Sequence, residues 1–184
     1  MYNAKLIKWF IAWAILMVIV IVLTLPSSRP PKIDTVGFET TESAQLYFKN
    51  VRAFYYNKGE GAGGIFETYR LQSLFTDSIT ELPFVIYNNW RTNESFIRLD
   101  TNFNASNEYI DIITDSASVK KDTIAIPQLS NEAQYVFAKE VYKSLQSGKR
   151  LGMLTEEGID WIKESDQVSI KRALTDYFRL VNKI

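Results

Sequence analysis

The longest apolar stretch lies near the start of the chain. Between Leu6 and Leu25 the only charged residue is Lys8, and as a helix this stretch would span about 30 Å. That length matches the hydrocarbon thickness of a bilayer, so residues 1–25 are predicted to hold a short cytoplasmic stub and a transmembrane helix. A cleaved signal peptide is the alternative, but the exit sequence Thr24–Arg29 lacks the small-x-small pattern of a cleavage site. We therefore expect an uncleaved signal-anchor.

The charges around this stretch predict its orientation. Lys5 and Lys8 lie at its start, and Arg29 and Lys32 follow it, which gives a slight positive-inside bias toward a cytoplasmic N-terminus. Four tripeptides of the form Asp, Ser or Thr, aliphatic resemble an O-glycosylation sequon that one large group of Gram-negative bacteria uses on exported proteins, although such pairs are also ordinary turns. They begin at Asp34, Asp77, Asp115 and Asp122. The sequence thus predicts a single-pass protein of a bacterial inner membrane with a periplasmic C-terminal domain.

The first part of that domain has the composition of β-strands. Residues 26–36 are Pro-rich and predict an extended spacer, and residues 37–184 suit one domain. Six strands are predicted, at Tyr47–Asn57, Ile65–Phe75, Pro83–Trp90, Ser95–Asp100, Tyr109–Thr114 and Thr123–Pro127. The first has a helical alternative, because Ala44, Phe48 and Val51 recur at helix spacing, but the glycine loop after it favours a strand. Short strands separated by turn residues predict one antiparallel sheet of about six strands.

The last part of the chain has helical periodicity. Ser130 or Asn131 can cap a helix that runs to Ser147, with Gly148 just past its end. A shorter helix is expected from Thr155, burying Ile159 and Ile162. A final helix starts near Asp166 and places Ile170, Leu174, Tyr177, Phe178 and Val181 on one side. Two to three helices packed on the sheet give an α+β fold, and the last helix is expected to close the domain rather than to bind a partner.

The amino-acid composition excludes several kinds of catalytic and metal-binding site. The chain of 184 residues has no Cys and no His, which excludes disulfides, thiolate nucleophiles, imidazole catalysis and metal sites built from these residues. It carries 21 Lys and Arg against 21 Asp and Glu, so it lacks the basic excess of nucleic-acid-binding domains. We expect no nucleic-acid partner and no cofactor, and only carboxylates remain for acid–base catalysis.

One glycine-rich stretch invites a nucleotide-binding interpretation. Gly59–Gly64 matches the pattern G-x-G-x-x-G, but the dinucleotide fingerprint requires a helix after the glycines, and here a strand is predicted. The glycine loop of protein kinases does lie between strands, yet the catalytic motifs that accompany it are missing from this sequence. We therefore interpret the stretch as a flexible hairpin loop.

Carboxylates and asparagines gather between residues 100 and 115. They are Asp100, Asn102, Asn104, Asn107, Glu108, Asp111 and Asp115. Paired carboxylates would suit a glycan hydrolase, and the loop Asp100–Asn104 could hold calcium, although it lacks the spacing of an EF-hand. Because Asn and Asp are also ordinary turn residues, we favour turns here and assign no metal ligand.

Aromatic and basic pairs are the remaining candidates. Trp90–Arg91 and Tyr55–Tyr56 could contact a sugar or a protein, but aromatic residues at strand ends are more often half-buried core. Lys120–Lys121 and Lys149–Arg150 are interpreted as solvated turn charges.

No residue is therefore assigned a catalytic, cofactor-binding or metal-binding role. The leading hypothesis is a membrane-anchored, non-catalytic accessory or scaffold domain whose partners are the lipid bilayer and a membrane or envelope protein. The alternatives are a carboxylate-dependent glycan hydrolase of the envelope and a ligand-binding module.

Overall fold

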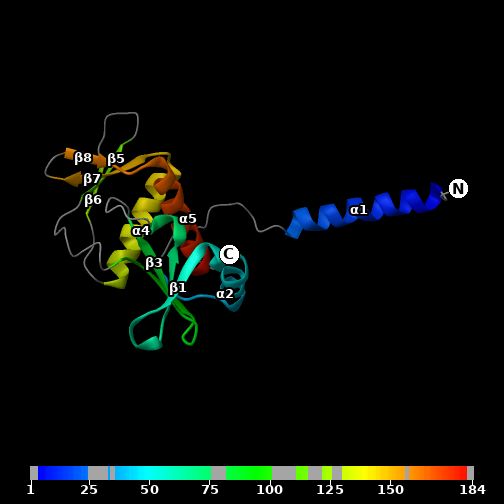
Figure 1. Ribbon diagram of the computed structural model, residues 1–184, viewed down its shortest axis with the longest axis horizontal. Helices are drawn as coiled ribbons and strands as arrows, with labels where there is room; N and C mark the ends of the chain where they lie inside the picture. Colours follow the sequence, from blue (N-terminus) through cyan, green and yellow to red (C-terminus); the bar gives the residue numbers. More distant parts are fainter. Residues whose placement is uncertain are drawn as a thin grey trace. The chain divides into compact units, whose positions relative to one another are not determined.

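The chain divides into two compact units, Met1–Pro30 and Pro31–Ile184. The computed structural model describes residues 4–24, 33, 36–75, 82–100, 111–115, 122–125, 130–155 and 158–181. Among these residues the first unit contributes one helix, and the second contributes all the strands and the other helices (Figure 1).

The first unit is formed by helix α1, which runs from Ala4 to Thr24 and confirms that the apolar stretch is helical. Its described side chains, from Ile7 to Val18, are exposed. Within the described residues no helix is both long enough and apolar enough to cross a membrane. For this part of the chain the predicted transmembrane anchor is wrong. The predicted single-pass topology and periplasmic location depended on this anchor and are wrong with it.

The second unit opens with a helical segment where a strand was expected. Helix α2 (Glu42–Tyr47) continues into a π-helical turn, η1 (Phe48–Arg52), and a 3-10 turn, η2 (Ala53–Tyr55). The Thr41 hydroxyl caps the start of α2, accepting a hydrogen bond at 3.2 Å from a backbone N–H three residues on. The predicted strand Tyr47–Asn57 is therefore wrong over most of its length, and the helical alternative holds.

Four strands then form an antiparallel sheet in chain order. They are β1 (Tyr56–Glu60), β2 (Glu67–Leu71), β3 (Phe84–Asn89) and β4 (Glu94–Leu99). The predicted hairpin loop is confirmed for Gly61–Gly64, which joins β1 to β2 through the 3-10 turn η3 (Ala62–Gly64), whereas Gly59 and Glu60 belong to β1. Another 3-10 turn, η4 (Gln72–Leu74), follows β2. The outer edge of β4 is covered by the segment before α2, since the Ser95 N–H donates to the Phe38 carbonyl at 2.8 Å.

A second antiparallel sheet corrects the prediction of one six-stranded sheet. Its strands are β5 (Asp111–Asp115), β6 (Asp122–Ala125), β7 (Arg150–Thr155) and β8 (Gly158–Trp161), in the order β6-β5-β7-β8. The helix expected from Thr155 is wrong, because Thr155 ends β7 and pairs with Gly158 at the start of β8. Ile162 is buried as predicted, but it follows a strand and lies outside any helix.

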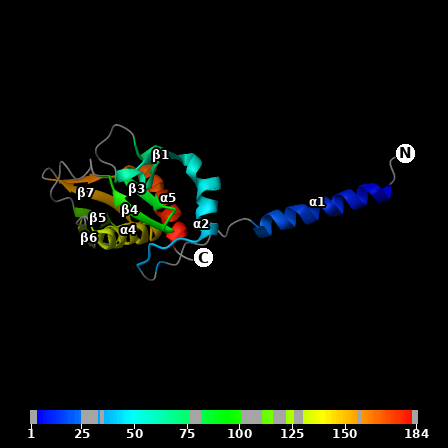
Figure 2. The same cartoon turned by 90° about the horizontal axis from the view of Figure 1, so that it is seen from below.

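Two long helices cover one face of the first sheet. They are α4 (Asn131–Gln146) and α5 (Glu164–Val181). Ser130 caps α4, and Gly148 after its end has φ +76°, both as predicted. Both helices contact β4 and each other, and the two views show them against this sheet (Figures 1 and 2). The α+β class therefore holds, with two sheets in place of one.

The core lies between these helices and the sheet. The apolar side of α5 is buried as predicted, and Phe178 is completely enclosed. Its ring lies 5.6 Å from that of Tyr135 and 5.2 Å from those of Tyr142 and Tyr177, measured between ring centroids. The expectation that the C-terminal helix closes the domain is confirmed.

We predict that Phe178→Ala lowers the free energy of unfolding by about 3–5 kcal/mol, because it leaves a cavity among three aromatic rings. The measurement is urea-induced unfolding followed by near-ultraviolet circular dichroism. Val168→Ala is the matched control on the same helix, since the Val168 side chain is 63% exposed and its loss should cost less than about 0.5 kcal/mol. Equal effects of the two changes would contradict this account of the core.

Candidate functional site

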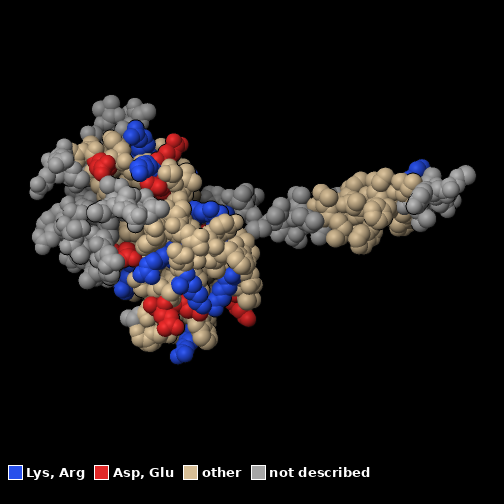
Figure 3. Space-filling view, in the orientation of Figure 1, with Lys and Arg blue, Asp and Glu red and all other residues tan. Residues whose placement is uncertain are grey.

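The segment Glu42–Tyr55 carries four exposed apolar side chains, alongside the exposed polar residues Glu42, Ser43 and Asn50. Phe54 is 77% exposed, Leu46 52%, Val51 46% and Tyr55 44%, and we call these four residues the helical face. Single exposed apolar residues are ordinary on protein surfaces, but four on one short segment form a patch of the kind that marks an interaction site. Figure 3 shows an uncharged surface beside α2, bordered by both basic and acidic side chains.

The inner side of the same segment is held by a buried carboxylate. Asp176 on α5 accepts two hydrogen bonds from Arg52, at 2.7 and 2.8 Å, and one from the Tyr56 hydroxyl at 2.8 Å. The hydrogen bond to Asp176 raises the pKa of Arg52 and keeps the guanidinium charged. Burial, with the nearby Asp176 charge, raises the pKa of Tyr56 well above its usual value, so its hydroxyl stays a donor at neutral pH. These bonds fix how the segment is rotated on the domain.

Cations and aromatic rings flank the helical face. The Arg172 guanidinium lies 4.1 Å from the centroid of the Tyr55 ring, and the Lys49 ammonium lies 5.6 Å from that of Trp90. Trp90 is half exposed at the turn after β3, and Arg91 also stacks on it. The structure therefore separates the sequence candidates: Tyr55 and Trp90 are surface residues, whereas Tyr56 is core.

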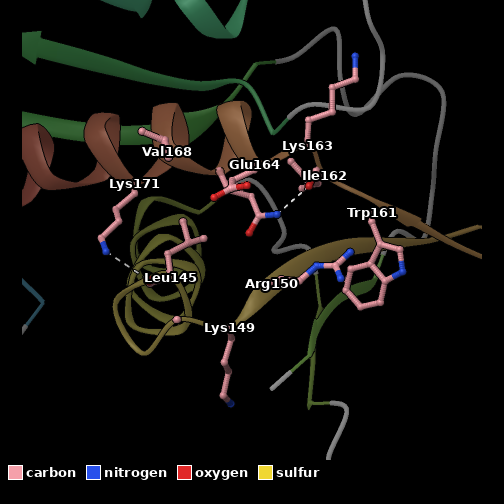
Figure 4. Close-up of a pocket in the computed structure, with 11 residues that line it drawn as sticks. Leu145, Lys149, Arg150, Trp161, Ile162, Lys163, Glu164, Val168 and Lys171 are labelled. Atoms are coloured by element: carbon pink, nitrogen blue, oxygen red, sulfur yellow. Dashed lines mark hydrogen bonds between the residues drawn. The ribbon is translucent and has the colours of Figure 1, made fainter. Parts of the chain in front are cut away.

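A second candidate is a pocket of about 630 Å³, which we call the α4–α5 pocket. It lies where α4 ends and α5 begins, with the start of β7 and the end of β8 completing its wall (Figure 4). Gln167 fixes this junction, since its amide N–H donates to the Ile162 carbonyl at 2.7 Å and its oxygen accepts the Leu151 N–H at 3.2 Å. Lys149 and Arg150, which the sequence suggested were solvated turn charges, both line the pocket.

The indole ring of Trp161 forms one wall of the pocket, and it lies close to the backbone of a glycine. Trp161 on β8 pairs in register with Gly152 on β7, and a Cβ at Gly152 would come within 2.9 Å of the Trp161 ring. The Arg150 guanidinium lies 4.5 Å from the centroid of the same ring. Gly152 thus allows the indole to lie close over β7 beside Arg150. No local sequence pattern predicts this arrangement.

The carboxylates between residues 100 and 115, to which the sequence assigned no site, are described only in part. Asp100 is buried and paired with Arg70, whose Nε lies 3.1 Å from its carboxylate, so it is a structural ion pair. Asp111 and Asp115 are the two end residues of β5. No group of three or more Asp and Glu able to hold a metal occurs in the part of the chain that the structure describes. The remaining candidates lie outside that part: Asn102, Asn104, Asn107, Glu108, Lys120–Lys121, and the tripeptide starts Asp34 and Asp77.

Comparison with protein-family models, with curated proteins and with solved structures found no match to this chain. The functional argument therefore rests on the helical face and the α4–α5 pocket themselves.

We predict that Asp176→Asn destabilises the second unit by about 3–5 kcal/mol, because it leaves the Arg52 charge without its buried partner. Urea unfolding measured by near-ultraviolet circular dichroism reports this loss. Asp160→Asn, at an exposed position on β8, is the control and should change stability by less than about 0.5 kcal/mol. A loss below about 1 kcal/mol for Asp176→Asn would show that the carboxylate does not anchor the segment.

We also predict that Gly152→Ala displaces Trp161. The new methyl group would lie 2.8 Å from a methyl of Ile159 and 2.9 Å from the indole, so the ring must move, at a cost of about 1–3 kcal/mol. Near-ultraviolet circular dichroism of the folded chain detects a change in the environment of the indole. Gly37→Ala is the control, because no atom lies within 4 Å of a Cβ there. An unchanged spectrum for Gly152→Ala would refute the close approach.

Proposed function

We propose that the second unit is a non-catalytic association module that joins two copies of this chain through the helical face. The observation that carries the proposal is the exposure of Phe54, Leu46 and Val51 on a segment that Asp176 holds in one orientation. Because the segment is already ordered, little further backbone entropy is lost when its exposed apolar side chains are covered, which favours binding. The role keeps the accessory or scaffold function expected from the sequence and does not depend on a membrane anchor.

The charges at the two ends of the segment favour a second copy as the partner. Glu42 lies at the start, in the first turn of α2, whereas Arg172 lies against Tyr55 at the end. When two copies pair with their segments antiparallel, the acidic end of each segment contacts the basic end of the other. A twofold axis makes these two contacts identical, as a symmetric dimer requires. The apolar residues between the ends then cover one another.

The size of the helical face sets the expected strength of the dimer. From Glu42 to Tyr55 the segment is roughly 20 Å long, so the contact lies at the low end of specific interfaces. Trp90, next to Lys49, can extend it on one side. We therefore expect a dimer that dissociates on dilution rather than an obligate one.

The other functions considered from the sequence have weaker support. A glycan hydrolase needs two carboxylates that face each other across a cleft, and Asp100 is instead bound to Arg70.

Cysteine cross-linking tests the dimer in the full chain, which contains no native Cys. Asn50 is exposed near the middle of the segment. In an antiparallel pair it lies close to the twofold axis and faces its own copy. Helix axes 8–10 Å apart bring facing Cα atoms to about 4–5 Å, which is within reach of a disulfide. We predict that Asn50→Cys forms a disulfide-linked dimer under mild oxidation.

Two further variants make this test specific. Glu132→Cys, exposed in the first turn of α4, should stay monomeric under the same conditions. Phe54→Asp in the Asn50→Cys background should abolish the link, because it places a charge in the apolar contact. Equal cross-linking at positions 50 and 132, or cross-linking that survives Phe54→Asp, would rule out association through the helical face.

A further inference from the structure

The α4–α5 pocket gathers positive charge in a chain whose net charge is zero. Its lining includes four cationic side chains, Lys149, Arg150, Lys163 and Lys171, and one carboxylate, Glu164. Lys149 and Arg150 follow the end of α4, whereas Lys163 precedes α5 and Lys171 lies on it. The excess is therefore created by the fold, and it does not follow from a basic run in the sequence.

The structure itself uses some of these cations but leaves others available. Lys171 donates to the Leu145 carbonyl at 3.3 Å, an oxygen at the end of α4 that also accepts backbone N–H groups. Among the carboxylates whose side chains the structure describes, none forms an ion pair with Arg150 or Lys163. The Arg150 guanidinium lies 4.5 Å from the centroid of the Trp161 ring, and this contact uses none of its five N–H donors, which an anion can accept.

The arrangement of the side chains assigns Arg150 the central role. In Figure 4 Lys149 and Lys163 extend away from the pocket on opposite sides, whereas Arg150 lies next to Trp161. The two lysines therefore contribute mainly through the potential at the rim. The start of α5 adds to it, because Glu164 and Gln167 in its first turn line the pocket and the positive end of the helix dipole lies there.

We propose that the α4–α5 pocket binds a small ligand that carries an oxyanion, a carboxylate or a phosphate, with Arg150 as its principal contact and Trp161 as an apolar wall. A volume of about 630 Å³ lies within the range of small-molecule sites. Gln167 holds the wall in place through two hydrogen bonds, so the site does not have to form on binding. Glu164 opposes the ligand charge and limits the affinity for simple anions.

Calorimetric titration of the full chain with citrate and with inorganic pyrophosphate tests this proposal at low ionic strength. Binding of citrate alone identifies a carboxylate ligand, and binding of pyrophosphate alone identifies a phosphate ligand. Arg150→Gln should weaken binding roughly tenfold or more, because a charge-assisted hydrogen bond is lost. Lys163→Gln should weaken it less, and Glu164→Gln should tighten it by removing a like charge.

The matched control is Lys139→Gln, which removes one positive charge from α4 outside the pocket. It should leave the affinity unchanged within twofold. Failure of both probes to bind, or equal weakening by Arg150→Gln and Lys139→Gln, would overturn the proposal. Added potassium chloride should weaken binding through screening, and an affinity independent of salt would also count against it.

Discussion

The burial of one side of α5 is the constraint on which the second unit depends. Ile170, Leu174 and Phe178 recur at helix spacing and are fully enclosed between α4 and the first sheet. Burying each of these side chains contributes roughly 1.5–3 kcal/mol, so α5 cannot rotate without a large loss. The polar residues on its other sides are fixed as a consequence. Gln167 then organises the α4–α5 pocket, and Asp176 organises the helical face.

Asp176 illustrates how a buried charge can select one arrangement while adding little stability. Removing a carboxylate from water is costly, and the bonds from Arg52 and Tyr56 largely offset that cost. Arg52, within the segment Glu42–Tyr55, and Tyr56, directly after it, both donate to this carboxylate. In this arrangement Arg52 is directed inward and Phe54 lies on the surface. The exposure of the helical face therefore follows from satisfying the buried charge, and we infer that it is a specified feature of the fold.

The sequence predicted the elements whose local signals agree with their tertiary contacts. Helix α4 has a capping Ser130 and a terminal Gly148, and both act as expected. The segment around Phe48 failed because aromatic and β-branched residues favour a strand, whereas Phe48 contacts the Tyr56 and Tyr69 rings from a helical turn. The hairpin of β7 and β8 was missed because its pairing places Gly152 beneath Trp161, a contact between strands that periodicity does not encode.

The same reasoning explains why neither candidate site could be read from the sequence. Arg150 and Lys163 are separated by the β7–β8 hairpin, and only that hairpin brings them to one pocket. The adjacent residues Lys171 and Arg172 diverge on α5, the first toward Leu145 at the pocket and the second toward Tyr55 at the helical face. One turn of α5 thus serves both sites without sharing a side chain between them. Because the connection is a rigid helix rather than a movable contact, ligand binding at the pocket and pairing at the helical face should be energetically independent.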